Sequence, residues 1–264
     1  MSKGILLTKR SSFQVYAANY LYKKGIIDAV VFEGGKSSFP RKKNIFELIK
    51  TLNKEFSLTK NFLIKVLNKI FFDKYFGKQQ YHNNRILIKN YNELQKEIIL
   101  YEIENINDQK TFEILKKNNY KLIYVFGTSI IKTNILSLKN AFFINMHWGW
   151  SPEFRGEGII SALATKGKKG LGVTVHLIDD KIDSGDLIYR FKPEIDFKDN
   201  FYSIGLKLTL LGLNGFIKTH RTITRNKILK LEKQNLKQGK VYTSRYMKEN
   251  PKLIFKAWKN LKKS

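Results

Sequence analysis

The sequence predicts an α/β fold built on a mostly parallel β-sheet. Two short apolar runs near the start of the chain, residues 4–8 (GILLT) and 28–33 (DAVVFE), flank a helical pattern. A strand, a helix and a second strand in this order build parallel sheets, because the helix carries the chain back to the end from which the first strand started. The 264 residues are enough for one sizeable α/β core with a modest appendage, or for two small domains.

The first helix is expected to start at Ser11 or Ser12, which are both suitable N-cap residues, and to end at Gly25. The preceding strand runs into the helix N-terminus, which attracts anions, and Lys9 and Arg10 add positive charge there. Lys9, Arg10 and Ser11 are therefore candidate substrate-binding residues. Because the segment has no glycine-rich phosphate loop, solvated surface residues are an equally good interpretation.

Residues from about 37 to 84 are predicted to form a basic helical insertion. Apolar residues between positions 63 and 71 follow the spacing of an amphipathic helix, with lysines interspersed. We expect the insertion to pack on the sheet, with a membrane-surface role as the alternative. Beyond it, residues 101–107 are predicted to be extended, Asp108 to cap a helix, and residues 120–128 to form a strand.

The last third of the chain is predicted to hold one long helix and a short tail. Residues 186–190 should form a strand and residues 200–222 a helix, in which Gly212 either weakens the helix or marks close packing. His220 lies near the end of this helix, where a charged imidazole would stabilise the helix dipole. In the tail, residues 236–244 (LKQGKVYTS) are hairpin-like, and a terminal helix follows.

Composition excludes several kinds of site. A hydrophobic fraction of 42% with 13% aromatic residues favours a folded globule. The absence of cysteine excludes disulfides, a thiolate nucleophile and cysteine-ligated metals, and with four histidines we predict no metal site. No apolar run approaches the roughly 18 residues that span a bilayer, and the N-terminal run is too short for a signal peptide. We therefore expect a cytoplasmic protein without a transmembrane segment.

The net charge of +27 is the most unusual property of the chain. A basic protein invites a nucleic-acid interpretation. However, the basic residues are mostly lysine, are spread along the whole chain and accompany many asparagines and isoleucines, a pattern that genome composition also produces. The charge therefore favours a basic surface suited to phosphate-bearing substrates, and leaves nucleic-acid binding as an alternative.

The candidate chemistry lies between residues 144 and 186. Asn145 and His147 end an apolar strand pattern (AFFINMH), and their two-residue spacing places them on one face. A second strand, residues 172–178, leads to a turn that contains Asp183, which can reach His147 if both strands share a sheet. Amide donors, an imidazole and a carboxylate suit attack on a carbonyl carbon. On spacing alone, a histidine at a strand end is more often a structural residue than a catalytic one.

The same segment resembles the formyltransferases that use 10-formyltetrahydrofolate. The matching motifs are Asn145-x-His147, Pro152, Phe154-Arg155-Gly156 and Asp183-Ser184-Gly185. The resemblance is strong over about residues 120–195. It departs in the loop after His147, where two tryptophans and a glycine replace the usual residues and leave the substrate side open.

This resemblance implies a Rossmann-like three-layer formyltransferase fold, with a central, mostly parallel sheet, a helical insertion and a short α/β C-terminal tail. It also implies a catalytic domain over residues 1–200 and a C-terminal extension over residues 201–264. The expected reaction moves a formyl group from 10-formyltetrahydrofolate, the co-substrate, to a primary amine. Asn145 and His147 would then meet the oxyanion, and Asp183 would support His147.

The family's ligand contacts can be carried over by position. The residues implied for folate binding are Ile130, Ile131, Lys132, Asp179, Asp180, Lys181 and Ile182. Arg155 is a candidate for substrate binding, as are Trp148 and Trp150, whose rings could stack on a sugar or base or simply pack the loop. His176, on the strand before Asp183, either supports the site or fills the core.

Several acceptor amines are known in this family. The expected layouts of the enzymes acting on glycinamide ribonucleotide and on methionyl initiator tRNA, and of the folate deformylase, fit this chain less well than that of the sugar-nucleotide N-formyltransferases. We therefore expect a nucleotide-linked amino sugar, as used in surface glycans such as lipopolysaccharide. A methionyl-tRNA formyltransferase and a non-catalytic nucleic-acid-binding protein on the same fold are the alternatives, and a homodimer stays open.

Overall fold

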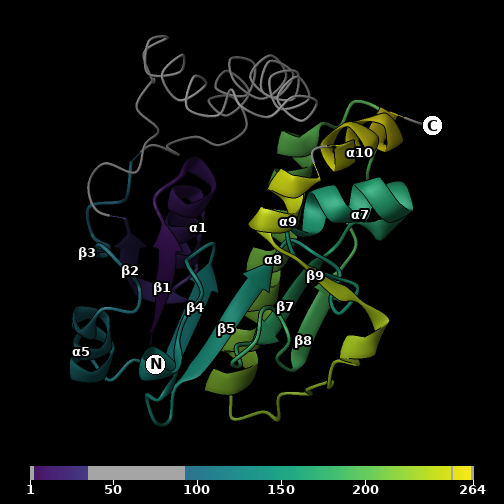
Figure 1. Ribbon diagram of the computed structural model, residues 1–264. Coiled ribbons are helices and arrows are strands. Elements are labelled where there is room, and N and C mark those ends of the chain that lie inside the picture. Colours follow the sequence, from purple (N-terminus) through teal and green to yellow (C-terminus); the bar gives the residue numbers. More distant parts are fainter. Residues whose placement is uncertain (1–2, 35–92, 251, 263–264) are drawn as a thin grey trace, which may run out of the picture.

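The computed structural model describes residues 3–34, 93–250 and 252–262 (Figure 1). The predicted helical insertion at residues 37–84 lies outside the described residues. The central sheet has seven strands in the order β3-β2-β1-β4-β5-β7-β8. Its strands are β1 (Gly4–Lys9), β2 (Ile27–Glu33), β3 (Ile99–Ile103), β4 (Leu122–Phe126), β5 (Phe142–His147), β7 (Val173–Leu177) and β8 (Leu187–Phe191).

Five neighbouring strands of the sheet are parallel, which confirms the predicted sheet. Strand β1 pairs in parallel with β2 and β4, β2 with β3, and β4 with β5. Strand β7 is antiparallel to both β5 and β8. A second, two-stranded sheet joins β6 (Phe154–Gly156) to β9 (Lys240–Tyr242).

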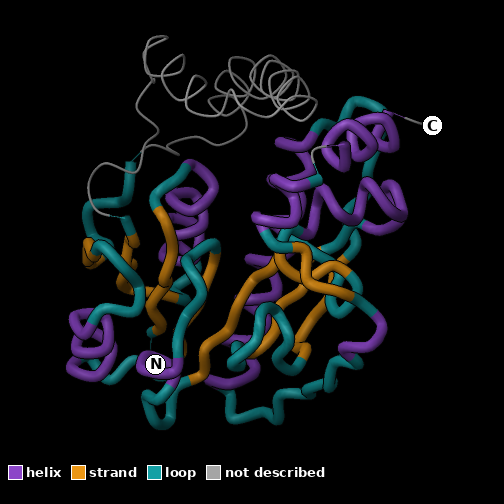
Figure 2. The backbone as a smooth tube through the Cα atoms, viewed as in Figure 1, coloured by secondary structure: helices purple, strands orange, loops and turns teal. Residues whose placement is uncertain are grey.

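Some of the described helices cover the two faces of the sheet, and others gather beyond one end of it (Figure 2). The described helices are α1 (Ser12–Lys23), α5 (Gln109–Lys117), α6 (Thr133–Leu136), α7 (Gly158–Lys166), α8 (Phe201–Thr224), α9 (Ser244–Glu249) and α10 (Lys252–Lys262), with short 3-10 turns at Gly167–Gly170 and Leu236–Gln238. Among the residues that the structure describes, no helix is both long and apolar enough to cross a membrane.

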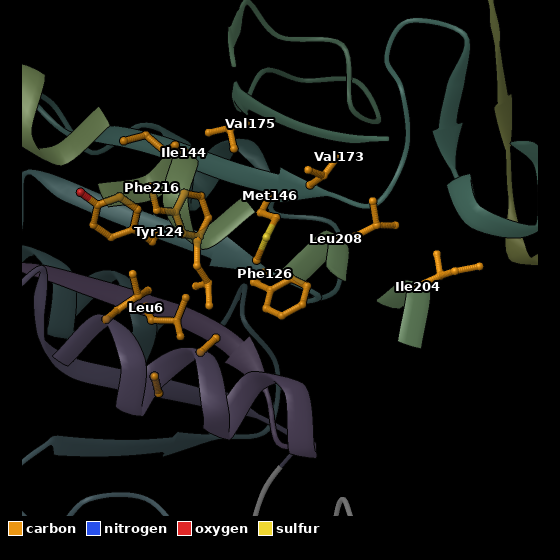
Figure 3. Close-up of a cluster of buried hydrophobic side chains, with 14 of the residues drawn as sticks. Leu6, Tyr124, Phe126, Ile144, Met146, Val173, Val175, Ile204, Leu208 and Phe216 are labelled. Atoms are coloured by element: carbon orange, nitrogen blue, oxygen red, sulfur yellow. The ribbon is translucent and has the colours of Figure 1, made fainter. Parts of the chain in front are cut away.

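Alternation along the strands builds two hydrophobic cores. In β1, Leu6 belongs to the core shared with α1 and α8, whereas Ile5 and Leu7 belong to the core shared with α5 and α6. Successive side chains of a strand point to opposite faces, so an uninterrupted apolar strand requires cover on both. Figure 3 shows the larger core, where Tyr124 and Met146 meet Phe216 of α8. The predicted three-layer arrangement is confirmed.

Helix α8 approaches the sheet unusually closely. It begins with a reciprocal cap, in which Asn200 Oδ1 accepts a 2.9 Å hydrogen bond from the Ser203 N–H and Ser203 Oγ accepts one of 3.0 Å from the Asn200 N–H. A β-carbon at Gly212 would overlap the sulfur of Met146 on β5. Gly212 therefore marks close packing. This helix lies in the predicted C-terminal extension, yet it contributes to the same core as the central strands.

Two expectations about the middle of the chain need correction. The extended segment is Ile99–Ile103, so it starts two residues earlier than predicted. The chain leaves the strand because the buried carboxylate of Glu33 accepts a 3.1 Å hydrogen bond from the Ile106 N–H, which holds that residue in a loop. Asp108 occupies the N-cap position of α5 as predicted, but its side chain makes no capping hydrogen bond. Its carboxylate accepts a 3.1 Å hydrogen bond from the Asn105 N–H instead.

The histidine of α8 and the tail also differ from expectation. His220 is buried, and its Nδ1 lies 2.9 Å from the Tyr124 hydroxyl. Burial lowers the pKa of His220, so it does not act as a charged partner of the helix terminus. The tail forms no hairpin: β9 pairs in parallel with β6, with Phe154 opposite Lys240 and Gly156 opposite Tyr242. A distant strand thus supplies the hydrogen bonds that a hairpin would have made.

Candidate active site

A cavity of about 390 Å³ opens at the carboxyl ends of β4 and β5. From β1 the chain builds the sheet toward β2 and β3, whereas from β4 it builds toward β5, so the direction reverses between β1 and β4. Ligands of open α/β sheets bind at such a reversal. The lining consists of Gln14, residues 125–131 and 145–148, Gly156, Glu157, His176, Ile178, Asp179 and residues 181–183.

Two strands and one turn bring the candidate residues together. Asn145 and His147 both reach the cavity from β5, as their spacing predicts. Strand β7 runs antiparallel to β5 and places His176 directly opposite Asn145. The turn after β7 then returns Asp183 to His147, as expected for two strands of one sheet.

The Asp183 carboxylate lies at the centre of this cluster. Its Oδ2 is 3.3 Å from His147 Nδ1 and accepts a 2.8 Å hydrogen bond from the Gly156 N–H. Its Oδ1 accepts a 3.2 Å hydrogen bond from Asn145 Nδ2 and lies 3.4 Å from His176 Nε2. All four neighbours present nitrogen atoms that can carry hydrogen, which suits an ionised carboxylate because it only accepts.

The surroundings keep Asp183 ionised. Burial alone would raise the pKa of Asp183, but the adjacent His147 and His176 and the Gly156 N–H outweigh it and hold the pKa well below its ordinary range. The backbone of Asp183 has a positive φ of 47°, which is uncommon outside glycine and better tolerated by Asp than by most residues. A carboxylate fixed there can orient an imidazole and stabilise positive charge on it.

Both ring nitrogens of His147 face oxygen atoms of the protein. Nε2 lies 2.7 Å from the backbone oxygen of Phe154, and the side chain is only 7% exposed. Both nitrogens can donate only when each carries a hydrogen. A β-carbon at Gly149 would overlap His147 Nε2 and the Phe154 oxygen, so this contact requires glycine in the loop. To donate into the cavity, His147 must give up the bond to Phe154.

His176 is part of the cluster and not simply core filler. Its Nδ1 lies 2.6 Å from the Leu177 backbone oxygen, so this nitrogen carries a hydrogen. Its Nε2 faces the cluster, 3.1 Å from Asn145 Nδ2. An amide, two imidazoles and an ionised carboxylate at one cavity can move a proton and stabilise negative charge on a carbonyl oxygen.

Most of the residues expected to bind folate line the cavity. Ile130 is 65% exposed at its edge, whereas Ile131 is buried in the core beneath it. Asp179, Lys181 and Ile182 form part of the lining with them. Two expected residues lie outside the lining. Asp180 is exposed, and Lys132 is the N-cap residue of α6, where its N–H donates a 2.7 Å hydrogen bond to the Asn107 side chain.

The three residues expected to bind substrate at the start of α1 also lie outside the lining. Lys9 and Arg10 face carboxylates of β2 and β3, at 3.9 Å and 3.6 Å. Ser11 Oγ donates a hydrogen bond to the side chain of Gln14. Neighbouring groups engage these basic and hydroxyl side chains in the structure, and substrate binding by the three residues stays a prediction.

Of the remaining candidate substrate-binding residues, Trp148 lines the cavity, whereas Trp150 and Arg155 do not. Trp148 lines the cavity, but its ring also packs against Phe13, at 5.2 Å between centroids, as well as Phe126. Trp150 lies outside the lining, with Lys192 Nζ 4.0 Å from its ring centroid. Arg155 is buried outside the lining, and its Nε has no hydrogen-bond partner. Trp150 packs in the loop, and its contact with a substrate stays a prediction.

Sequence reasoning missed Gln14 and Glu157, which both line the cavity. Each lies at a helix start, Gln14 in the first turn of α1 and Glu157 immediately before α7. Helix starts that follow a strand often lie near the carboxyl edge of the sheet, which was the available signal. Glu157 is additionally held by the Ser244 hydroxyl, which donates a 2.6 Å hydrogen bond to its carboxylate.

The sheet reversal and the cavity define an α/β protein in which an amide, two imidazoles and a carboxylate meet at one site. Residues 49–219, more than half of the chain, match the formyl transferase family, and the protein belongs to this family. The resemblance seen in the sequence is thereby confirmed.

Individual relatives match parts of the sequence or the whole fold. Methionyl-tRNA formyltransferase from Caldicellulosiruptor saccharolyticus is 31% identical over 118 residues, which are 44% of this chain and 38% of that protein. The chain spans less than half the length of the first curated relatives it matches.

Two solved structures share the fold over nearly the whole chain. A 4-N formyltransferase from Francisella tularensis aligns with a TM-score of 0.56 and 16% identity, covering 97% of this chain and 88% of that one. An N-formyltransferase from Helicobacter canadensis, in complex with folinic acid and dTDP-3-aminofucose, aligns with a TM-score of 0.56 and 17% identity, covering 92% and 72%.

Proposed function

We propose that the protein transfers a formyl group from 10-formyltetrahydrofolate to the amino group of a nucleotide-linked amino sugar. The observation that carries this proposal is the cluster of Asn145, His147, His176 and Asp183 around one cavity, in a chain of the formyl transferase family. An enzyme that moves a formyl group between nitrogens needs a hydrogen-bond donor for the formyl oxygen and a means of moving one proton.

The cluster can supply both. The neutral amine attacks the formyl carbon, a new carbon–nitrogen bond forms and negative charge develops on the formyl oxygen. Asn145 and His147 donate hydrogen bonds to that oxygen, each in exchange for a bond that it makes to the protein now. Asp183 stabilises positive charge on His147. The proton of the amine passes to N10 of the folate as the old carbon–nitrogen bond breaks.

The sugar-nucleotide acceptor is supported by fold and charge. The two aligned structures are described as a 4-N formyltransferase and an N-formyltransferase, and the second holds folinic acid and dTDP-3-aminofucose. The net charge of +27 suits a substrate that carries phosphate groups. We place the folate between Ile130 and the turn that contains Ile182, and the acceptor toward Trp148 and Glu157 on the other side of the cluster.

Methionyl-tRNA is the second candidate acceptor. It is favoured by the 31% identity to a methionyl-tRNA formyltransferase and by the same positive charge. A panel assay separates the candidates: dTDP- and UDP-linked amino sugars, glycinamide ribonucleotide and charged initiator tRNA are each incubated with the protein and 10-formyltetrahydrofolate. Mass spectrometry should find one added formyl group on a sugar nucleotide. A gain on the tRNA alone would contradict the proposed acceptor.

His147→Ala tests the mechanism. The variant should lose formyl transfer by about 10²-fold or more, because it removes a donor to the oxyanion. Binding of 5-formyltetrahydrofolate, measured by isothermal titration calorimetry, should change little, since the cavity walls that hold the folate remain. Full activity in His147→Ala would refute the assigned role.

A further inference from the structure

We infer that Gln234, in the C-terminal tail, is a positioning residue that holds Asp183 in place for the reaction. The inference rests on the proposed function, in which Asp183 supports His147. Gln234 is partly buried, and its Nε2 donates two hydrogen bonds, of 3.0 Å to the Asp183 backbone oxygen and of 2.7 Å to the Gly185 backbone oxygen.

These two bonds hold the turn at Asp183, whose backbone conformation is unfavourable. Asp183 has a positive φ of 47°, a conformation in which a side chain other than glycine's crowds the backbone. Such a conformation persists when the surroundings impose it. The carbonyls on both sides of Ser184 are held by one amide group, so the turn cannot relax without breaking a bond to Gln234.

The tail is anchored on either side of Gln234. Just before it, Glu232 exchanges two backbone hydrogen bonds with Leu187 of β8, of 2.8 Å and 3.0 Å. The Glu232 carboxylate also receives two hydrogen bonds from Arg190 of β8, of 2.9 Å and 3.0 Å. Figure 1 shows the tail running from the end of α8 past β8 and on to β9. Gln234 therefore reaches the turn from a fixed backbone.

The same tail supports the opposite side of His147. Strand β9 pairs with β6, and the Glu157 N–H donates a 2.7 Å hydrogen bond to the Tyr242 oxygen. Strand β6 provides the Phe154 oxygen that faces His147 and the Gly156 N–H that binds Asp183. One segment of the tail thus holds both partners of the imidazole ring.

The chemistry of the amide gives a sharp discriminating variant. Both acceptors are carbonyl oxygens, so the residue at position 234 must donate. Glutamate has the same length and shape as glutamine but, when ionised, only accepts. If Gln234 acts by donating, Gln234→Glu should be as harmful as Gln234→Ala. If Gln234 only fills space, Gln234→Glu should behave like the wild type.

The first experiment needs no activity. Amide hydrogen exchange, read by mass spectrometry, should speed up at least about tenfold in the segment 179–186 of Gln234→Ala and Gln234→Glu, with little change in the peptides of β1 and β4. Gln238→Ala is the matched control, because Gln238 lies exposed in the same tail. Unchanged exchange in the segment 179–186 of both Gln234 variants would overturn the inference, whether or not the protein transfers formyl groups.

The second experiment measures the catalytic consequence. In Gln234→Ala, kcat should fall about 10-fold to 100-fold with KM changed little, because a small displacement of Asp183 misaligns His147 without altering the walls of the cavity. In the background of Asp183→Asn, the same change at position 234 should have almost no further effect on kcat, since residues that act through one another are not additive. Equal losses in both backgrounds would overturn the role through Asp183.

A wild-type protein inactive on every acceptor would count against the proposed function, and the exchange experiment would still decide the role of Gln234.

Discussion

At the scale of single residues, Asp183 links β5, which carries His147, to β6 and β7. Its carboxylate contacts side chains from β5 and β7 and a backbone N–H of β6. An ionised carboxylate surrounded by donors lowers the energy of the folded chain and also orients the imidazole for chemistry. The residue therefore links stability to activity.

Replacing Asp183 by Asn tests this link. The amide has the same shape but carries no charge, so it can no longer stabilise positive charge on His147. We expect formyl transfer to fall by at least about 10²-fold, as when one electrostatic contact of a transition state is removed. Asp186→Asn is the matched control in the same turn. Similar rates for both variants in a steady-state assay would argue against the charge as the cause.

Two buried carboxylates make stability depend on acid pH. For both Asp183 and Asp199, burial would raise the pKa, but hydrogen bonds and positive partners lower it in the folded state. For Asp199 these partners are Lys207 and Ser203, at 2.7 Å and 2.6 Å. A depressed pKa stabilises the fold above the ordinary carboxyl value of about 3.9, and this contribution is lost as pH falls through the folded value.

The corresponding prediction concerns Asp199→Asn, which lies away from the cavity. The loss in free energy of unfolding should be largest above about pH 4 and should shrink as pH falls below it. Urea unfolding of the variant and the wild type at a series of pH values measures this difference. A loss that stays constant down to the acid limit would show that the carboxylate charge is not responsible.

At the scale of elements, the fold depends on how closely α8 lies on the sheet. A β-carbon at Gly212 would overlap the side chain of Met146 and press against that of Val173. In a packed core such overlap is relieved only by moving the helix or by forcing side chains from their preferred rotamers. Because Met146 stands between Asn145 and His147, movement at this contact reaches the site.

Gly212→Ala should destabilise the protein by about 1–3 kcal/mol, the usual cost of overpacking a core. The gain in helix propensity, about 1 kcal/mol, acts in the opposite direction and reduces the net loss. Asn214→Ala, at an exposed position of the same helix, is the control and should be neutral or slightly stabilising. Urea denaturation of the two variants checks the sign, and a stabilised Gly212→Ala would show that Met146 moves aside freely.

At the scale of the whole molecule, one cavity is lined by the sheet, the helix starts and the turn after β7, and helix α8 and the tail pack behind these elements. Strands β4 and β5 form its floor, the turn after β7 closes one side, and β6, paired with β9, bounds another. Helix α10 packs on α7, where Asn260 Nδ2 donates a 2.8 Å hydrogen bond to the Leu163 oxygen. A ligand that binds here binds the assembled fold, and so should stabilise the whole chain.

We therefore expect 5-formyltetrahydrofolate to raise the melting temperature of the wild type by several degrees. A ligand at 100 times its Kd adds about 2.7 kcal/mol when the unfolded chain does not bind it. Differential scanning fluorimetry across folate concentrations measures the effect. Retention on nucleic acid that falls steeply with salt, with no response to folate, would favour the nucleic-acid alternative instead.

The sequence by itself determined the local features. Apolar runs predicted the strands, and the two-residue spacing of Asn145 and His147 placed both on one face, because side-chain alternation is a property of the backbone alone. The motif around Asp183 added the family and its fold. These features depend on neighbours in the chain, which the sequence shows directly.

Only the tertiary structure decided which residues from distant segments meet. The antiparallel register set His176 opposite Asn145, and the pairing of β9 with β6 replaced an expected hairpin. The sequence left open whether Trp150 stacks on a substrate or packs the loop, and the fold brings Lys192 Nζ to 4.0 Å from its ring centroid. Gln234 had no signal in the sequence, because its role comes from two backbone carbonyls that only the folded turn presents. Long-range pairing is a collective result of packing, so local spacing cannot predict it.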